Sequence, residues 1–263
     1  MIRRLAIAGL LLLGLSSAAR AVELRLVYIE QDASPYLTGS GPIIPARPGI
    51  AVELVQRTVT RLGGRLVLTR MPARRMIQEV KAGRQDGVLG FRYSAERAQD
   101  LVFPMRDGQP DATRHAARLA HSLYRRQGSA ITWDGRRVGG LTTPLAVSST
   151  QLVADALQAQ GIEIIRIENS GQMFAMLALE RVDAVVSIDI IGDRQMVEQP
   201  STQAGTRIEK VIPPVLIEDF HVPLGHAFHA ANRDFAERLW RMIGELRDAT
   251  YAELTPVYVT TSP

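Results

Sequence analysis

The hydrophobic pattern of the chain repeats one arrangement twice. Residues 84–89 (RQDGVL) and residues 181–186 (RVDAVV) each place an arginine and an aspartate before a short apolar run. Each is preceded by a stretch whose apolar residues recur at helical spacing: Met76, Ile77 and Val80, then Met173, Met176 and Leu177. Such spacing followed by an apolar run predicts a helix and then a strand. The repeat indicates two similar α/β lobes, although this junction also occurs in many other α/β folds.

The first half of the chain alternates between the two periodicities. Its predicted strands are 24–29, 65–69 and 88–91, and its predicted helices are 50–62 and 72–82. The stretch 30–48 is rich in proline and glycine and reads as a loop long enough to be functional. Ser94 is expected to cap a further short helix. The order strand–helix–strand–helix–strand predicts a mostly parallel sheet covered by helices.

The second half repeats this alternation after a basic, less periodic crossover at 106–130. Here we expect strands at 136–141, 163–167 and 184–188, helices at 151–160 and 172–179, and a closing helix at 232–247. The chain as a whole is therefore predicted to be an α/β protein of two units.

The first 21 residues are predicted to be a cleaved signal peptide. Arg3 and Arg4 precede an apolar core at 5–15, and Ala19-Arg20-Ala21 fits a small-x-small cleavage site. That core is too short to span a bilayer as a helix. Because the sequence contains no cysteine, we expect no lipoprotein anchor and no disulfide. The protein is expected to be periplasmic and stabilised by its core alone.

The net charge and the motifs of the sequence argue against several classes of partner and cofactor. Without the three arginines of the signal peptide, 28 Lys and Arg residues face 27 Asp and Glu residues, which does not favour a nucleic-acid partner. His221, His226 and His229 lack the spacing of a metal site. No glycine-rich loop has a phosphate-binding spacing. We therefore expect no metal and no cofactor.

The segment 71–104 resembles bacterial extracellular solute-binding proteins of family 3, the type II periplasmic binding proteins that serve ABC importers of polar amino acids. The residues that carry the resemblance are Pro72-Ala73-Arg74, Ala82-Gly83-Arg84-x-Asp86, Ser94-Ala95-Glu96-Arg97 and Phe103-Pro104. Similar matches at 48–54, 133–139, 181–189 and in the final helix to Tyr258 extend it over nearly the whole mature chain.

The resemblance implies a two-lobed clamp with a ligand cleft between mostly parallel sheets flanked by helices. Lobe 1 would comprise 22–108 and the C-terminal return 222–263, and lobe 2 would comprise 109–221. It also implies a monomeric receptor that captures a small carboxylated solute, an amino acid or related organic acid, for an inner-membrane ABC permease. No catalytic residue is expected.

Candidate ligand-binding residues come after the two repeated strands, because ligands of open α/β sheets bind beyond the carboxyl ends of strands. The resemblance implies that Arg97 holds an α-carboxylate, for which a guanidinium fork is suited, and that Asp189 holds an α-amino group. Tyr36 would form an aromatic lid, and Thr142 and Thr143 would supply hydroxyls from lobe 2. The alternatives are a surface salt bridge for Arg97, a helix N-cap for Asp189 and a half-buried loop residue for Tyr36.

Arg92 departs from the family pattern, in which a serine or threonine often stands two residues before the position of Ser94. Together with Arg74 and Arg97, it would bring three cations to the cleft and favour a ligand with extra negative charge, such as a dicarboxylate. The alternative is that Arg92 and Arg74 are solvated or paired with Glu79 or Asp100.

Two other functions remain open from the sequence. One is an enzyme on the same fold that resembles periplasmic cyclohexadienyl dehydratases, for which Glu96, Asp189 or Glu30 would supply the general acid. The other is a ligand-sensing or accessory module without a transport role.

Overall fold

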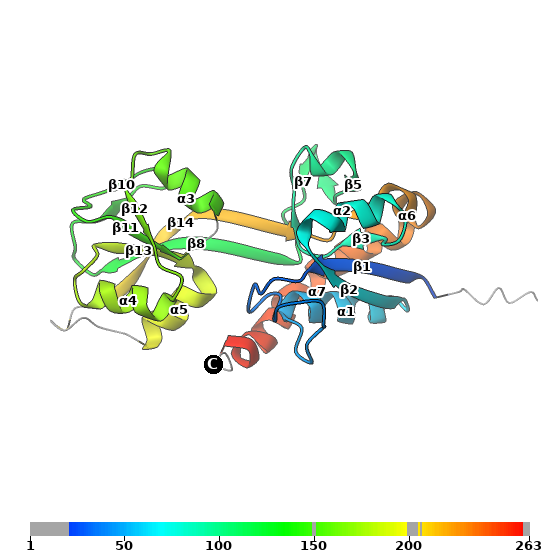
Figure 1. Ribbon diagram of the computed structural model, residues 1–263, viewed down its shortest axis with the longest axis horizontal. Coiled ribbons are helices and arrows are strands. Elements are labelled where there is room, and N and C mark those ends of the chain that lie inside the picture. Colours follow the sequence, from blue (N-terminus) through cyan, green and yellow to red (C-terminus); the bar gives the residue numbers. More distant parts are fainter. Residues whose placement is uncertain (1–20, 149–150, 199–204, 206, 260–263) are drawn as a thin grey trace, which may run out of the picture.

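The computed structural model describes residues 21–148, 151–198, 205 and 207–259. The predicted signal peptide lies outside the described residues, apart from Ala21. The described chain forms two α/β lobes that lie end to end and are joined by two long strands (Figure 1). No helix among the described residues is both long and apolar enough to cross a membrane.

Lobe 1 is built on a five-stranded sheet of order β2-β1-β3-β15-β5. Its strands are β1 (Glu23–Ile29), β2 (Arg65–Met71), β3 (Gly87–Val88), β5 (Leu101–Val102) and β15 (Leu224–Gly225). Its helices are α1 (Ile50–Arg61), α2 (Ala73–Lys81), α6 (His226–Ala231) and α7 (Arg233–Val259). Strands β2, β1 and β3 run parallel, and β15 is antiparallel to both of its neighbours.

The side chains of β1 alternate between the two faces of this sheet, as the pleat requires. Leu24, Leu26 and Tyr28 pack against α1 and α7, whereas Val27 packs against α2. Trp240 of α7 is completely buried in the first cluster and donates from its indole nitrogen to the backbone oxygen of Val222 at 2.7 Å. The amphipathic spacing of the helices is therefore what fixes them to the sheet.

Lobe 2 is built on a six-stranded sheet of order β12-β11-β13-β8-β14-β4. Its strands are β4 (Phe91–Arg92), β8 (Ala117–Arg126), β11 (Leu145–Ser148), β12 (Ile164–Arg166), β13 (Ala184–Ile188) and β14 (Ile208–His221). Its helices are α3 (Gln151–Gln158), α4 (Ser170–Ala178) and α5 (Asp189–Glu198). The smaller elements are β9 (Thr132–Trp133) and β10 (Val138–Gly139) in lobe 2, and β6 (Met105–Arg106), β7 (Gln109–Pro110) and the 3-10 helix η1 (Arg97–Gln99) on the side of lobe 1 (Figure 1).

Strands β8 and β14 carry the chain from lobe 1 to lobe 2 and back (Figure 1). They pair antiparallel from Phe220 opposite Ala117 to Ile208 opposite Arg126, with a bulge between Val211 and Leu216. Strand β4 leaves lobe 1 to pair with the lobe 1 end of β14. The boundaries at 108/109 and 221/222 stay predictions, because both strands run continuously between the lobes.

Several predicted elements differ from the observed ones. The strand expected at 88–91 is divided between β3, in the lobe 1 sheet, and β4, which pairs with β14 in the lobe 2 sheet. The strand expected at 136–141 is only the two-residue β10, and the strand that joins the lobe 2 sheet, between β12 and β13, is β11, which comes later. The reason is burial: Leu145, Ala146 and Val147 fill the sheet interior. The closing helix expected to end at 247 runs to Val259, because Leu254 and Tyr258 continue its buried face.

The aspartates of the two repeated phrases have the same structural role. In lobe 1, Asp86 precedes β3 and accepts from the backbone N–H of Arg25 at 2.8 Å and from its guanidinium. In lobe 2, Asp183 precedes β13 and accepts from the backbone N–H groups of Thr142 and Thr143 at 2.6 and 2.8 Å. Asp86 therefore binds the first half of the neighbouring parallel strand β1, and Asp183 binds the chain just before the neighbouring parallel strand β11.

We predict that Asp183→Ala destabilises the protein by about 2 kcal/mol, because two backbone donors and two threonine hydroxyls lose their acceptor. Burial raises the pKa of Asp183, but these hydrogen bonds outweigh it and leave the pKa below its usual value. Urea unfolding measures the loss. Asp248→Ala, at a side chain that is 85% exposed, is the matched control and should change stability by less than about 0.5 kcal/mol. Equal losses for the two variants would contradict this role of Asp183.

We also predict that stability falls as the pH drops from about 6.5 to about 4. The pKa of His115 is lowered to about 4, first by burial and then by the positive charge of Arg247. Arg118 lowers this pKa further, whereas the negative charge of Asp219 raises it. The unfolded chain, with a histidine pKa of about 6.5, takes up the proton first. His115→Gln should flatten this part of the curve of Tm against pH. His226→Gln, at an exposed site, should not.

Candidate functional site

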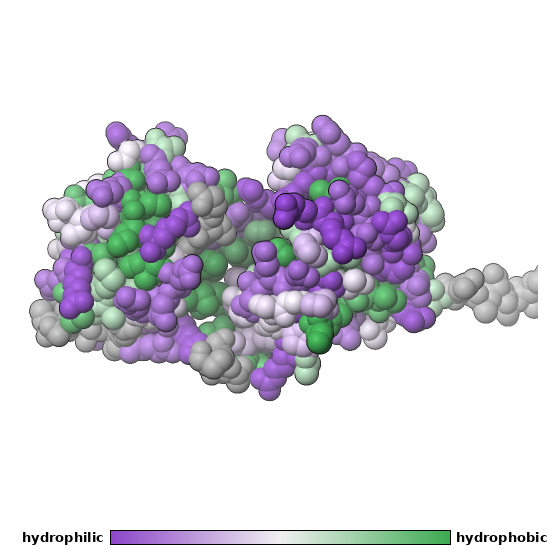
Figure 2. All heavy atoms as spheres, viewed as in Figure 1, coloured by the Kyte–Doolittle hydropathy of each residue, from purple (hydrophilic) through white to green (hydrophobic). Residues whose placement is uncertain are grey.

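A cavity of about 370 Å³ lies where the two lobes meet the crossover strands. Lobe 1 and its loop contribute one wall, β8 and β14 the floor, and the ends of β11 and β13 the other wall. Figure 2 shows hydrophobic atoms in the recess between the lobes. The lining residues are Ala33, Ser34, Tyr36, Leu37, Ala51, Gly90, Ala116, Ala117, Leu119, Ser148, Ile188 and Phe220.

The loop between β1 and α1 brings Tyr36 to this cavity, and its role as an aromatic lid stays a prediction. Its hydroxyl donates to the backbone oxygen of Arg118 at 3.2 Å, and its ring lies 6.0 Å from that of Tyr251. Burial raises the pKa of Tyr36 far above its usual value, and the negative charge of Asp189 adds to the effect. Tyr36 is thus a fixed wall of the cavity, only 8% exposed.

The loop is held in place by its own backbone contacts. Gly49 has a φ of 113°, and a Cβ there would lie 2.3 Å from the backbone oxygen of Tyr36. Only glycine allows this approach. The buried Arg70 holds the other side of the loop, donating to the backbone oxygens of Gly39 and Ile43.

One face of the crossover sheet points toward the cavity. Residues directly opposite each other in an antiparallel pair share a face, and the pairs are Ala117 with Phe220 and Leu119 with Glu218. Ile188 of β13 lies opposite His121 in the same way. Four of these six residues line the cavity. Glu218 and His121 therefore belong to the cavity-side face of the sheet.

Arg92 lies on that same face, opposite Phe220, and pairs with Glu218. Its Nε is 3.6 Å from Oε1 of Glu218, whose Oε2 lies 3.0 Å from Nε2 of His121. Glu218 is 4% exposed and His121 is fully buried, whereas the Arg92 side chain is 40% exposed. The partners that the sequence offered for Arg92, Glu79 and Asp100, are instead bound to Arg84 and Lys81. The charge of Arg92 is balanced by a buried carboxylate that the sequence did not identify.

Arg97 begins the short helix η1, where Ser94 accepts its backbone N–H at 3.2 Å, as expected for a cap. Its Nη1 donates to the backbone oxygen of Arg92 at 2.9 Å, and its guanidinium carbon lies 4.4 Å from the centre of the Phe91 ring. Burial and the neighbouring Arg92 charge lower the pKa of Arg97. Within the described part of the chain, no carboxylate forms an ion pair with it.

Asp189 is the first residue of α5 and shares Lys210 with Asp193. The Lys210 ammonium lies 3.0 Å from Oδ2 of Asp189 and 2.8 Å from Oδ2 of Asp193. Burial lowers the pKa of Lys210, but its bonds to the two carboxylates outweigh this and raise it. Oδ1 of Asp189 is buried without a hydrogen-bond partner. The charges of Asp189 and Asp193 are thus partly neutralised by Lys210, and one carboxylate oxygen of Asp189 is left without a hydrogen-bond partner.

Of the residues predicted for the site, Tyr36 lines the cavity, whereas Arg92, Ser94, Arg97 and Asp189 are not among its described lining residues, and neither are the three that remain. Thr142 and Thr143 bind Asp183 before the start of β11, whereas the cavity lies at its other end, where Ser148 lines it. Ser148 was not predicted from the sequence, although the apolar run Leu145–Val147 before a helix marks it as a strand end. Arg74 is exposed in the first turn of α2, and no ion pair to it occurs among the described residues.

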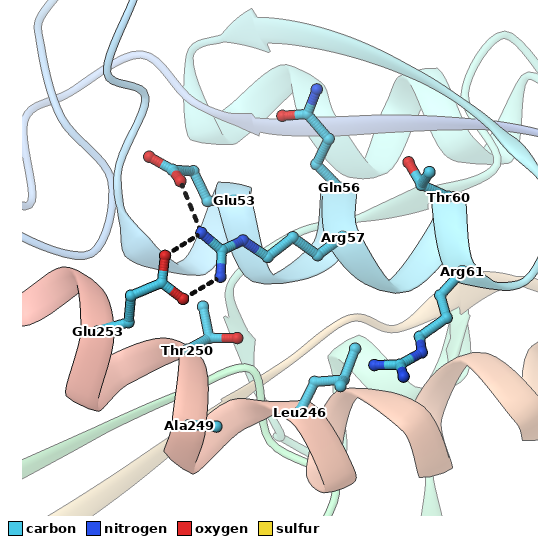
Figure 3. Close-up of a pocket in the computed structure, with 9 residues that line it drawn as sticks. All are labelled: Glu53, Gln56, Arg57, Thr60, Arg61, Leu246, Ala249, Thr250 and Glu253. Carbon is cyan, nitrogen blue, oxygen red and sulfur yellow. Dashed lines mark hydrogen bonds and ion pairs between the residues drawn. The ribbon is translucent and has the colours of Figure 1, made fainter.

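A second, more open depression lies between α1 and α7 (Figure 3). Arg57 crosses it and bonds to both carboxylate oxygens of Glu253 at 2.7 and 2.8 Å, with Glu53 at 3.8 Å. These side chains satisfy one another, and their helices belong to lobe 1 alone. The cavity between the lobes is therefore the better candidate for a ligand. Among the described residues, no group of His, Asp or Glu is placed to hold a metal ion.

No family model matches the sequence, and no curated protein sequence matches it. Solved structures do match. The L-cystine solute receptor of Neisseria gonorrhoeae in its unliganded open conformation aligns with 91% of this chain and 93% of its own, at a TM-score of 0.61 and 18% identity. An ancestral cationic amino acid solute-binding protein aligns with 90% of this chain and 95% of its own, at a TM-score of 0.57 and 14% identity.

A histidine kinase sensor domain with similarity to periplasmic binding proteins is also similar, with a TM-score of 0.51, 17% identity and coverage of 90% of this chain and 95% of its own. At these identities the matches establish the fold alone. The chain has the two-lobed fold of type II periplasmic binding proteins, which confirms the fold predicted from the sequence.

Proposed function

We propose that this protein is a periplasmic receptor that captures a small carboxylated solute between its two lobes and delivers it, as a monomer, to an ABC permease. The observation that carries the proposal is the cavity between the lobes, in a fold whose neighbours are solute-binding proteins. Binding of a ligand to both walls would shift the equilibrium between open and closed lobes.

Arg97 is the proposed anchor of the carboxylate. It is half-buried and carries a full positive charge without a carboxylate partner in the described part of the chain. It lies seven residues after Gly90, which lines the cavity. A guanidinium with free donors gains two parallel, charge-assisted hydrogen bonds from a carboxylate.

A sensor role is the second candidate, because one of the similar structures is a histidine kinase sensor domain. In that case the same closure would be read by a signalling partner. A pull-down from native membranes distinguishes the two: recovery of a permease supports transport, and recovery of a signalling protein supports sensing. The dehydratase alternative has no comparable support, because the similar structures reported above are solute-binding proteins and a sensor domain.

We predict that a carboxylated solute raises the Tm of the protein without being consumed, and that Arg97→Ala weakens its binding about 10- to 100-fold. The reason is the loss of a charge-assisted pair, for which about 1.5–3 kcal/mol is typical. A thermal-shift screen of amino acids and organic acids identifies the solute, and titration calorimetry measures its affinity.

Arg84→Ala is the control for this experiment, because Arg84 is an exposed arginine whose Nε bonds Glu79 at 2.6 Å. It should leave the affinity unchanged. A screen in which no compound shifts the Tm would overturn the receptor proposal. Unchanged affinity in Arg97→Ala would overturn only the role given to that residue.

A further inference from the structure

We propose that the solute has an apolar, uncharged body, such as an aromatic or branched aliphatic side chain, and that the protein discriminates against acidic and basic solutes. The inference rests on the proposed function and concerns the part of the ligand that lies beyond its carboxylate. The solute proposed here differs from the dicarboxylate that Arg74, Arg92 and Arg97 favoured in the sequence.

The lining of the cavity carries the first part of the argument. Ten of the twelve described lining residues are alanine, glycine, leucine, isoleucine, tyrosine or phenylalanine, and the other two are serines. None of these twelve is charged. The hydroxyl of Tyr36 is already directed to the backbone oxygen of Arg118. A charged group placed here would lose its water and gain no charged partner from the lining, which is strongly unfavourable.

The second part is that two charged side chains beside the lining, Arg92 and Asp189, are each bound to an oppositely charged partner within the protein. Arg92 shares the cavity-side face with Phe220, yet its guanidinium lies against Glu218, which also bonds His121. On the lobe 2 side, Asp189 lies next to the lining residue Ile188 but holds Lys210. A second anionic or cationic group on the ligand would have to compete with these partners.

The third part is the fit of an apolar body. The walls come from both lobes, so an apolar group bound to Leu37 and Ala51 of lobe 1 would also contact Ile188 of lobe 2. Burying it removes apolar surface of ligand and both lobes from water at once, which favours the closed form. The volume of about 370 Å³ lies within the usual range of about 300–1,000 Å³ for small-molecule sites.

The experiment compares ligands that share one head and differ only in the body. Phenylalanine, leucine, glutamate and arginine all carry the same carboxylate and ammonium. We expect calorimetry to show that phenylalanine or leucine binds at least about tenfold more tightly than glutamate or arginine, since a single methylene in an apolar pocket is worth about 10- to 200-fold. Tighter binding of glutamate or arginine would overturn the inference and leave the receptor proposal standing.

If none of the four binds, the same comparison is made with organic acids, 3-phenylpropionate and 4-methylpentanoate against succinate and glutarate. Preference for the first two supports the inference, and preference for the dicarboxylates overturns it. The absence of any binding in both series overturns the proposed function itself, so that the two failures are distinguishable.

A matched pair of variants places the apolar body in this cavity. Ala117→Leu adds volume on the cavity-side face of β8 and should weaken binding of the preferred apolar ligand about tenfold or more. Ala120→Leu makes the same change on the opposite face, where Ala120 lies opposite the exposed Ile217, and should leave binding unchanged. Unchanged binding in Ala117→Leu would contradict the location.

Leu119→Gln provides the second variant if Ala117→Leu does not fold, as judged by circular dichroism. Leu119 is only partly buried, so a polar amide should be accommodated there more easily. The Leu119→Gln substitution should weaken binding of the apolar ligand and reduce the ratio between its affinity and that of glutamate. An undiminished preference for the apolar ligand would contradict the inference.

Discussion

The antiparallel pairing of β8 and β14 is the interaction on which the rest of the structure depends. These two strands carry the chain between the lobes, and their register decides which residues face the cleft. Because Ala117, Leu119 and Phe220 share one face, the floor of the cavity is apolar. Because Glu218 shares that face, a buried carboxylate stands beside the cavity and balances Arg92. A shift of the register by one residue would turn the side chains of one strand to the opposite face, so that these residues would no longer share the cavity side of the sheet.

Each lobe is held together by the same arrangement around its central parallel strands. An aspartate before one strand accepts backbone hydrogen bonds from the first half of its neighbour or from the chain just before it: Asp86 from Arg25, and Asp183 from Thr142 and Thr143. Fixing the beginnings of the strands aligns their ends, where Gly90, Ser148 and Ile188 meet the cavity. The repeated phrase in the sequence is therefore structural, and it acts on function only by positioning the strand ends.

The site shows why formal charge in a sequence is a poor guide to ligand charge. Arg92 and Asp189 both lie near the cleft, and each has an internal partner in Glu218 or Lys210. A ligand that displaced Arg92 would leave the buried carboxylate of Glu218 without its cation, which is unfavourable. Arg97 differs in that its guanidinium contacts only a backbone oxygen and the Phe91 ring among the described residues. The charge available to a ligand is thus smaller than the sequence indicates.

The sequence by itself determined the two α/β units and, to within a residue or two, the helices at 50–61 and 73–81. It also determined the loop that holds Tyr36 and the cap at Ser94. These features depend on local periodicity and turn chemistry. Only the tertiary structure decided that Thr142 and Thr143 bind Asp183, that Ser148 reaches the cavity and that Glu218 neutralises Arg92. These contacts join residues 40 to 126 positions apart in the chain. They depend on strand register, which hydrophobic periodicity alone does not specify.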